Sequence, residues 1–163
     1  MTKILLIDVE KCTGCYSCVT TCSLVHEGVF SLNKSRIRLL KLEEKCLSIP
    51  LICEQCEESP CIEACPVNAI FRDSNGLVKI NRDICTGCAS CVQVCPYHGI
   101  RMIENKASIC DLCNGDPACV RVCIPTKAIQ FVDDTVENRR RKRELMSKKM
   151  DLFNKYFKDY EIV

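Results

Sequence analysis

The sequence predicts a small α+β fold that is organised by metal and ends in a helical tail. The chain has 163 residues, of which 17 are cysteine, a share far above ordinary usage. Sixteen of these cysteines fall into four groups of similar spacing, and a sustained helical period occurs near the C-terminus. With 6% aromatic residues and no tryptophan, the chain needs a source of folding energy other than a large apolar core.

The sequence also indicates the cellular compartment of the protein. No apolar stretch approaches the ~20 residues that cross a bilayer, so we expect no membrane span. Residues Met1 to Val9 lack the basic segment and the long apolar stretch of a secretory signal. We therefore expect a cytoplasmic protein. Because reducing compartments keep thiols free, metal binding is favoured over a disulfide framework.

Each cysteine group has the spacing of an iron–sulfur ligand motif. A C-x2-C-x2-C loop places three thiolates around one face of an iron–sulfur cube, and the next cysteine ligates the other cluster of a pair. Gly14 and Gly87 lie inside two such loops, where the backbone must pass close to sulfide. Zinc is the competing interpretation of paired CxxC motifs, but the fourfold repeat favours four [4Fe–4S] clusters. The motifs are Cys12, Cys15, Cys18, Cys22; then Cys53, Cys56, Cys61, Cys65; then Cys85, Cys88, Cys91, Cys95; and finally Cys110, Cys113, Cys119, Cys123.

The middle of the chain resembles a complete bacterial two-cluster ferredoxin. The resemblance is carried by Cys65-Pro66-Val67-Asn68-Ala69-Ile70, by Ile80-Asn81-Arg82-Asp83-Ile84-Cys85 and by Cys95-Pro96. Between the second and third motifs we expect two short strands, the second over Leu77 to Ile80, joined by a Ser74-Asn75-Gly76 turn. Residues 53–103 would then form one ferredoxin unit.

This resemblance determines how the motifs pair. If the second and third motifs complete one ferredoxin, the first and fourth must complete each other. The 30 residues between Cys22 and Cys53, and the 14 between Cys95 and Cys110, both depart from ferredoxin spacing. We therefore expect a duplicated, nested ferredoxin domain over 1–133, with an inner unit over 53–103 and an outer unit made of 1–52 and 104–133. The expected ligands are Cys12, Cys15, Cys18 and Cys123 for cluster 1; Cys110, Cys113, Cys119 and Cys22 for cluster 2; Cys53, Cys56, Cys61 and Cys95 for cluster 3; and Cys85, Cys88, Cys91 and Cys65 for cluster 4.

Further strands are expected around the motifs. The segments Lys3 to Asp8, Arg36 to Leu42, Ile100 to Ile103 and Ala128 to Val132 have the composition and alternation of short strands. Short helical turns should carry the third and fourth cysteine of each motif. The resulting fold is small in strand content, so cluster ligation would supply much of its folding free energy.

The nested arrangement resembles the four-cluster electron-transfer subunits of the dimethyl sulfoxide reductase type. The resemblance covers roughly residues 1–132 and rests on all four motifs, together with Cys110-Asp111-Leu112-Cys113 and Ser35-Arg36-Ile37-Arg38. The stretch from Cys22 to Arg38 is most similar to the small subunits that accompany tungsten aldehyde oxidoreductases and related tungsten enzymes. Unlike the inner motifs, Cys22 and Cys123 are not followed directly by proline.

The resemblance implies an electron carrier and not an enzyme. Such a subunit relays electrons through four [4Fe–4S] clusters between a large catalytic subunit that holds tungsten or molybdenum and a soluble ferredoxin or another redox module. Three alternatives stay open: a free-standing polyferredoxin, the iron–sulfur subunit of a hydrogenase, formate dehydrogenase or carbon monoxide dehydrogenase, and a structural or sensory iron–sulfur protein. The residues themselves show no nucleophile–base pair, phosphate loop or nucleotide fingerprint, so we expect no catalytic residue.

The tail, residues 134–163, combines a basic run with an apolar stripe. Residues 138–163 hold nine Lys and Arg against four Asp and Glu, a net charge of +5, whereas the rest of the chain has a net charge of −3. The helix could fold back on its own anionic body, or it could dock on a catalytic partner or on a second copy of the chain. Nucleic-acid binding is not expected, because no recognition motif accompanies the basic run. The run is Arg139 to Arg143, and the stripe is Met146, Met150, Phe153, Phe157 and Tyr160.

Some residues outside the motifs carry expectations of their own. Cys46 is expected to be a small buried residue beside Leu47 and Ile49, with an alternative ligand or a redox-sensitive thiol as the other interpretation. His26 would either donate to a cluster or pack against its loop, and His98 is assigned no role. An acidic set is expected on the solvated surface, with a docking face as the alternative; it consists of Glu54, Glu57, Glu58 and Glu63.

Overall fold

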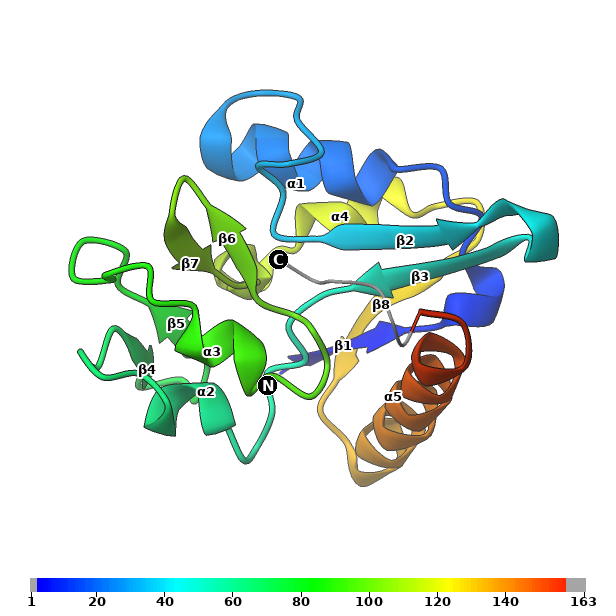
Figure 1. The fold of residues 1–163 in the computed structure, drawn as a ribbon. Helices are drawn as coiled ribbons and strands as arrows, with labels where there is room; N and C mark the ends of the chain where they lie inside the picture. The colour runs from blue at the N-terminus through cyan, green and yellow to red at the C-terminus, as the bar shows by residue number, and fades with distance from the viewer. Residues whose placement is uncertain (1–2, 158–163) are drawn as a thin grey trace.

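Antiparallel strand pairs and α-helices make up the protein, and the computed structural model describes residues 3–157. Each of the four sheets in this part of the chain has two strands, and a two-stranded sheet is marginally stable at best in water. The strand pairs are therefore stabilised by packing against the helices and the buried residues of the core. The predicted α+β ferredoxin-like fold with a C-terminal helix is confirmed (Figure 1). Among the described residues, no helix is both long and apolar enough to span a membrane.

The two ends of the ferredoxin body are joined by one strand pair. Strand β1 (Lys3–Ile7) pairs with β8 (Ile129–Asp133). The pairing continues where the amide of Asp8 donates to the carbonyl of Ala128 at 2.8 Å. Helix α1 (Ser17–Glu27) packs against α4 (Ala118–Val122) above this pair (Figure 1). The first and fourth cysteine motifs are thus brought side by side.

Two hairpins and two short helices form the opposite side of the molecule. Strands β4 (Ile70–Arg72) and β5 (Val78–Ile80) are joined by the expected turn, where the Asp73 carboxylate accepts from the amides of Asn75 and Leu77 at 2.9 Å each. Strands β6 (Arg101–Ile103) and β7 (Lys106–Ser108) form the second hairpin, which spans the expected boundary after residue 103. Helices α2 (Pro60–Glu63) and α3 (Ser90–Gln93) contact each other, and α2 also contacts β4. The division into inner and outer units stays a prediction.

The hairpin of β2 (Arg38–Leu42) and β3 (Leu47–Leu51) corrects the expectation for Cys46. Its tip is a 3-10 turn over Glu43–Lys45 that ends at Cys46, which has a φ of +49° and is exposed. The prediction of a buried residue was wrong. Sequence neighbours of Cys46 are apolar because they enter β3, but the tip itself projects away from the core.

Helix α5 (Val136–Phe157) lies along β1 and the β2–β3 hairpin (Figure 1). Phe153 and Phe157 are buried together with Leu40, Ile49 and Leu51. The tail therefore folds back on its own body, which is one of the two arrangements that the sequence allowed. These two phenylalanines are not available to a partner. The last stripe residue, Tyr160, lies outside the described residues.

Candidate metal centres

The first motif and the end of the fourth form a group of thiols that we name thiol set 1: Cys12, Cys15, Cys18 and Cys123. Burial raises the pKa of Cys18 to about 12, and the neighbouring thiols of Cys12, Cys15 and Cys123 contribute to the rise. Burial also raises the pKa of Cys12, opposed by a hydrogen bond from the Gly14 backbone and reinforced by Cys123 and Cys15. Thiols that disfavour one another's charge in this way need a bound cation to ionise together.

Thiol set 2 gathers the rest of the two outer motifs, Cys22, Cys110, Cys113 and Cys119. Burial raises the pKa of Cys119 to about 12, followed by the effects of Cys22 and Cys113. Cys110 is buried, and its burial, with Cys119 and Cys22 nearby, raises its pKa well above the ordinary value. The thiol of Cys22 has therefore crossed from the first motif to the fourth.

His26 lies beside thiol set 2. Its Nε2 is 3.5 Å from the Sγ of Cys113 and 3.6 Å from the carboxylate of Asp111. Asp111 in turn forms an ion pair with Arg36 at 2.7 Å. Burial, followed by the charge of Arg36, lowers the pKa of His26, and the nearby Asp111 opposes this effect. The histidine therefore touches a motif thiol, and an N–H donated to that thiol stays a prediction.

Thiol set 3 consists of Cys53, Cys56, Cys61 and Cys95. Burial raises the pKa of Cys56 to about 11, and the charges of Cys95 and Glu54 add to this effect while Lys142 opposes it. A Cβ on Gly99 would lie 2.5 Å from the Cα of Cys53, so glycine lets the segment after Cys95 rest on the second motif. A hollow of about 1170 Å³ reaches Cys53 and Cys56 and has the first half of α5 as one wall.

Thiol set 4 consists of Cys65, Cys85, Cys88 and Cys91, which line one small cavity. Burial, followed by the thiols of Cys61 and Cys85, raises the pKa of Cys91 to about 11. The amide of Ala69 donates to the Sγ of Cys65 at 3.2 Å. The amide of Gly99 donates to Cys95 in the same way at 3.4 Å. The two inner motifs thus hold their crossing cysteines by equivalent backbone hydrogen bonds.

The four thiol sets follow one another in a row. Cys119 of set 2 interacts with Cys18 of set 1, Cys53 of set 3 with Cys110 of set 2, and Cys91 of set 4 with Cys61 of set 3. The order through the molecule is therefore 1, 2, 3, 4. It differs from the order of the motifs along the chain because the outer motifs meet through β1 and β8.

Both ends of the row reach the surface. Cys15 in set 1 and Cys88 in set 4 are exposed, whereas the described thiols of set 2 are buried or half-buried. The hydroxyl of Ser17 lies 3.4 Å from the Sγ of Cys15, and that of Ser90 lies 3.5 Å from Cys88. These serines lower the pKa of the two thiols. The row thus has two accessible ends of the same local design.

The donor sets fit [4Fe–4S] clusters. Each set offers four thiols, the soft donors that iron–sulfur clusters require. In each set one thiol comes from the partner motif, which is the ligation pattern of paired cubes. The sets contain the same residues as the ligand sets predicted from the spacing, and their ligation of clusters stays a prediction.

Two contacts around thiol set 3 gave no signal in the motif spacing. The side chain of Gln55 donates to the carbonyls of Val78 at 3.0 Å and Cys110 at 2.7 Å, and accepts from the amide of Val78 at 2.7 Å. It therefore ties the second motif to the fourth and to β5. Such a cross-link between distant segments leaves no periodic trace in a sequence.

Glu54 is the second contact, and it corrects an expectation. The acidic set was expected on the surface, but Glu54 is buried in an ion pair with Lys149 of α5, whereas Glu57, Glu58 and Glu63 are not buried. The expectation failed for Glu54 because α5 covers it. A signal existed: Lys149 falls on the apolar stripe, three residues after Met146 and four before Phe153.

Comparisons with known proteins agree on the kind of site. Residues 45–134 match the family described as a 4Fe-4S dicluster domain. The polyferredoxin-like subunit of aliphatic sulfonate oxidoreductase from Pyrococcus furiosus is 43% identical over 122 residues, which are 73% of this chain and 70% of that protein. Formate hydrogenlyase subunit 2 of Escherichia coli K12 is 32% identical over 188 aligned positions, covering 89% and 90%. One of the subunits of tetrathionate reductase from Archaeoglobus fulgidus is 34% identical over 113 residues, 66% of this chain, which spans about half of that protein, 55%.

Proposed function

Because the chain belongs to the 4Fe-4S dicluster family of electron-transfer subunits of oxidoreductase complexes, we propose that it relays electrons between a tungsten or molybdenum catalytic subunit and a ferredoxin or a further redox module. The proposed catalytic subunit is of the aldehyde oxidoreductase type. In this role the chain carries out no substrate chemistry itself. Its task is to hold redox centres in order and to present the two end centres to partners.

The row of thiol sets with two exposed ends is the observation that carries this proposal. When bound, four [4Fe–4S] clusters supply one-electron transfer along such a row. The chain's own residues bury three of the four thiols of set 2 and leave Cys15 and Cys88 exposed. A protein that used clusters only to hold its fold would need fewer of them for about 130 residues and would gain nothing from aligning them.

The relatives support a fixed catalytic partner. The name of the Pyrococcus furiosus protein describes it as a subunit of an oxidoreductase, and the Escherichia coli protein is a subunit of formate hydrogenlyase. A tungsten subunit is favoured by the similarity of residues 22–38 to the small subunits of tungsten enzymes. A free-standing polyferredoxin, or service to a hydrogenase or a formate or carbon monoxide dehydrogenase, is the alternative.

Anaerobic co-purification tests the proposal. A tag on this chain, expressed in its native host, should retain a large subunit in stoichiometric amount, and metal analysis of the complex should find tungsten or molybdenum. The isolated chain should contain about sixteen iron and about sixteen acid-labile sulfide. Recovery of the chain without a large subunit would favour the free-standing carrier. A zinc-loaded chain, or iron near half the expected content, would overturn the four-cluster proposal.

A further inference from the structure

A buried ion pair joins α5 to the second cysteine motif. Lys149 is 0% exposed and Glu54 is 4% exposed, and the ammonium of Lys149 contacts the carboxylate of Glu54. Glu54 directly follows Cys53 and lies two residues before Cys56, in the loop that supplies thiol set 3. Lysine is almost never fully buried in proteins, and a buried ion pair stabilises a fold weakly, if at all. Stability alone therefore does not account for this pair.

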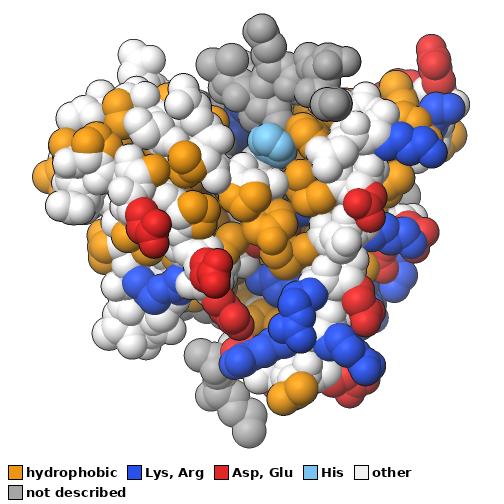
Figure 2. Space-filling model, turned by 60° about the horizontal axis from the view of Figure 1, so that its bottom comes forward, with side chains coloured by type: hydrophobic (Ala, Val, Ile, Leu, Met, Phe, Trp, Pro, Cys, Tyr) orange, Lys and Arg blue, Asp and Glu red, His pale blue; other side chains and the backbone are white. Residues whose placement is uncertain are grey.

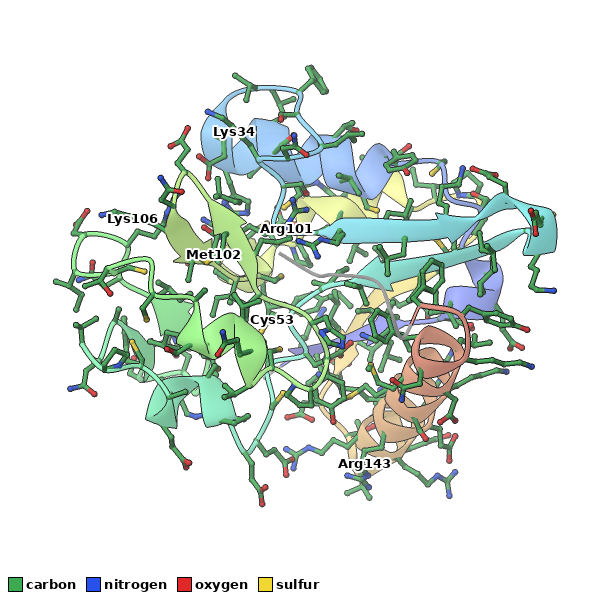
Figure 3. The ribbon with its side chains drawn as sticks, in the orientation of Figure 1. Lys34, Cys53, Arg101, Met102, Lys106 and Arg143 are labelled. Carbon is green, nitrogen blue, oxygen red and sulfur yellow. The ribbon has the colours of Figure 1, made fainter. Side chains whose placement is uncertain are left out.

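Other contacts place the same helix over both segments that supply thiol set 3. The ammonium of Lys142 donates to the backbone carbonyl of Glu54 at 2.6 Å and lies 3.9 Å from its carboxylate. The rings of Phe153 and His98 are 4.4 Å apart between centroids, and His98 follows Cys95 closely in the chain. Figure 3 shows Cys53 in the segment between β3 and α2, at the middle of the molecule, with Arg143 on α5 below it. Figure 2 shows Lys and Arg side chains gathered over this helix.

Two positive side chains and one negative side chain lie near thiol set 3. An oxidised [4Fe–4S] cube with four thiolates carries a net charge of about −2, and one-electron reduction makes it about −3. Glu54 adds a further negative charge, whereas Lys142 and Lys149 bring two positive charges. Because Lys149 is shielded from water, its charge acts over a longer range than that of a solvated lysine. Both lysines favour the reduced cube, and Glu54 opposes it.

We propose that the positive charges of Lys149 and Lys142 raise the reduction potential of the cluster in thiol set 3. An electron that reached this cluster from a neighbouring one would add a negative charge, which the two fixed ammonium groups would compensate. Helix α5 then has a redox role besides covering the core. This inference rests on the proposed function, because it requires a cluster at thiol set 3.

Potentiometric titration followed by electron paramagnetic resonance tests the proposal on the full chain. In Lys149→Met, the signal of one cluster should shift to a lower potential, by about tenfold in the ratio of reduced to oxidised cluster, which is about 59 mV for one electron. In Glu54→Gln, the same signal should shift upward, because a negative charge is removed. The signal is assigned to thiol set 3 if it changes in Cys56→Ser. A merely structural loosening would not give opposite signs for the two variants.

Lys148→Met is the matched control. Lys148 is the neighbouring residue of the same helix, but it pairs at 2.5 Å with Glu10, which is exposed. Its loss removes the same charge and should leave all potentials unchanged. Equal shifts in Lys148→Met and Lys149→Met, shifts of one sign in Lys149→Met and Glu54→Gln, or no shift in Lys149→Met would each overturn the proposal.

A second variant covers the case in which Lys149→Met does not fold. Lys142 is less deeply buried than Lys149, and Lys142→Met should lower the same potential by a smaller amount. An unchanged potential in Lys142→Met would then refute the proposal. Iron and sulfide are counted in every preparation. A low count in the unaltered protein contradicts the proposed function, whereas a full count with unshifted potentials contradicts only this inference.

Discussion

Cys22 and Cys123 each lie with the thiols of the other outer motif. Cys22 lies with the thiols of the fourth motif, and Cys123 lies with those of the first. We expect Cys22→Ser to change the signal of the cluster in thiol set 2 and to leave that of set 1, because serine is a poorer ligand for iron than a thiolate. Cys123→Ser should do the reverse. Mössbauer and electron paramagnetic resonance spectra of the two variants check this, and identical spectral changes in both would contradict the crossing.

Cys46 should behave differently from the other cysteines. Its thiol is exposed at the tip of the β2–β3 hairpin, outside all four thiol sets. We expect Cys46→Ser to retain the full iron and sulfide content and unchanged potentials. Measurement of both, with Cys56→Ser as the comparison that loses iron, tests this. A loss of iron in Cys46→Ser would make this thiol a ligand.

Single residues also show how far the sequence could be interpreted. Cysteine spacing predicted which thiols lie together, because three of each four are close in the chain and the fourth follows from ferredoxin pairing. The position of Cys46 depended on a hairpin tip that spacing does not describe. The partner of Lys149 lies on another element, at Glu54, so the sequence could show an unusual lysine on an apolar stripe but not what it contacts.

Helix α5 stabilises the body through one aromatic face. Phe153 is 4% exposed and packs with Phe157 and the apolar residues of the β2–β3 hairpin. We expect Phe153→Ala to lower the free energy of unfolding by about 3–5 kcal/mol, through lost burial and the cavity left behind. Anaerobic urea unfolding followed by circular dichroism measures this. Val136→Ala on the same helix, where the side chain is 86% exposed, should change the free energy by less than about 0.5 kcal/mol.

The helices and strands differ in how well the sequence predicted them. The β4–β5 hairpin was predicted because Asn75-Gly76 is a strong turn signal between apolar segments. Strand β3 was not predicted, because Pro50 lies within it and proline is usually excluded from strands. It is tolerated here in a sheet of two strands, each of which has a free edge. The short β7 was missed because Lys106, Ala107 and Ser108 are not among the β-branched and aromatic residues that are typical of strands.

We expect the fold of the whole molecule to depend on bound iron and sulfide. One group of buried core residues includes Cys18, Cys22, Cys110 and Cys119, and another includes Cys91. Removing the metal would leave these thiols around empty space, with sheets of two strands that cannot persist alone. We expect anaerobic iron removal by a chelator to abolish most of the far-ultraviolet circular dichroism. Iron and sulfide together should restore it, and an apoprotein with a native-like, dispersed proton spectrum would contradict this.

The nested topology has a consequence for biosynthesis. Ile7 pairs with Ile129, and Cys18 lies near Cys123, so during translation the segment around the first motif cannot be completed until the segment around the fourth motif has been synthesised. The segment from the second to the third motif can close on itself earlier in translation. Metal delivery to the nascent chain would therefore fill thiol sets 3 and 4 first and thiol sets 1 and 2 afterwards. Helix α5, which follows the fourth motif in the chain, would then close over thiol set 3 after metal has been delivered to it.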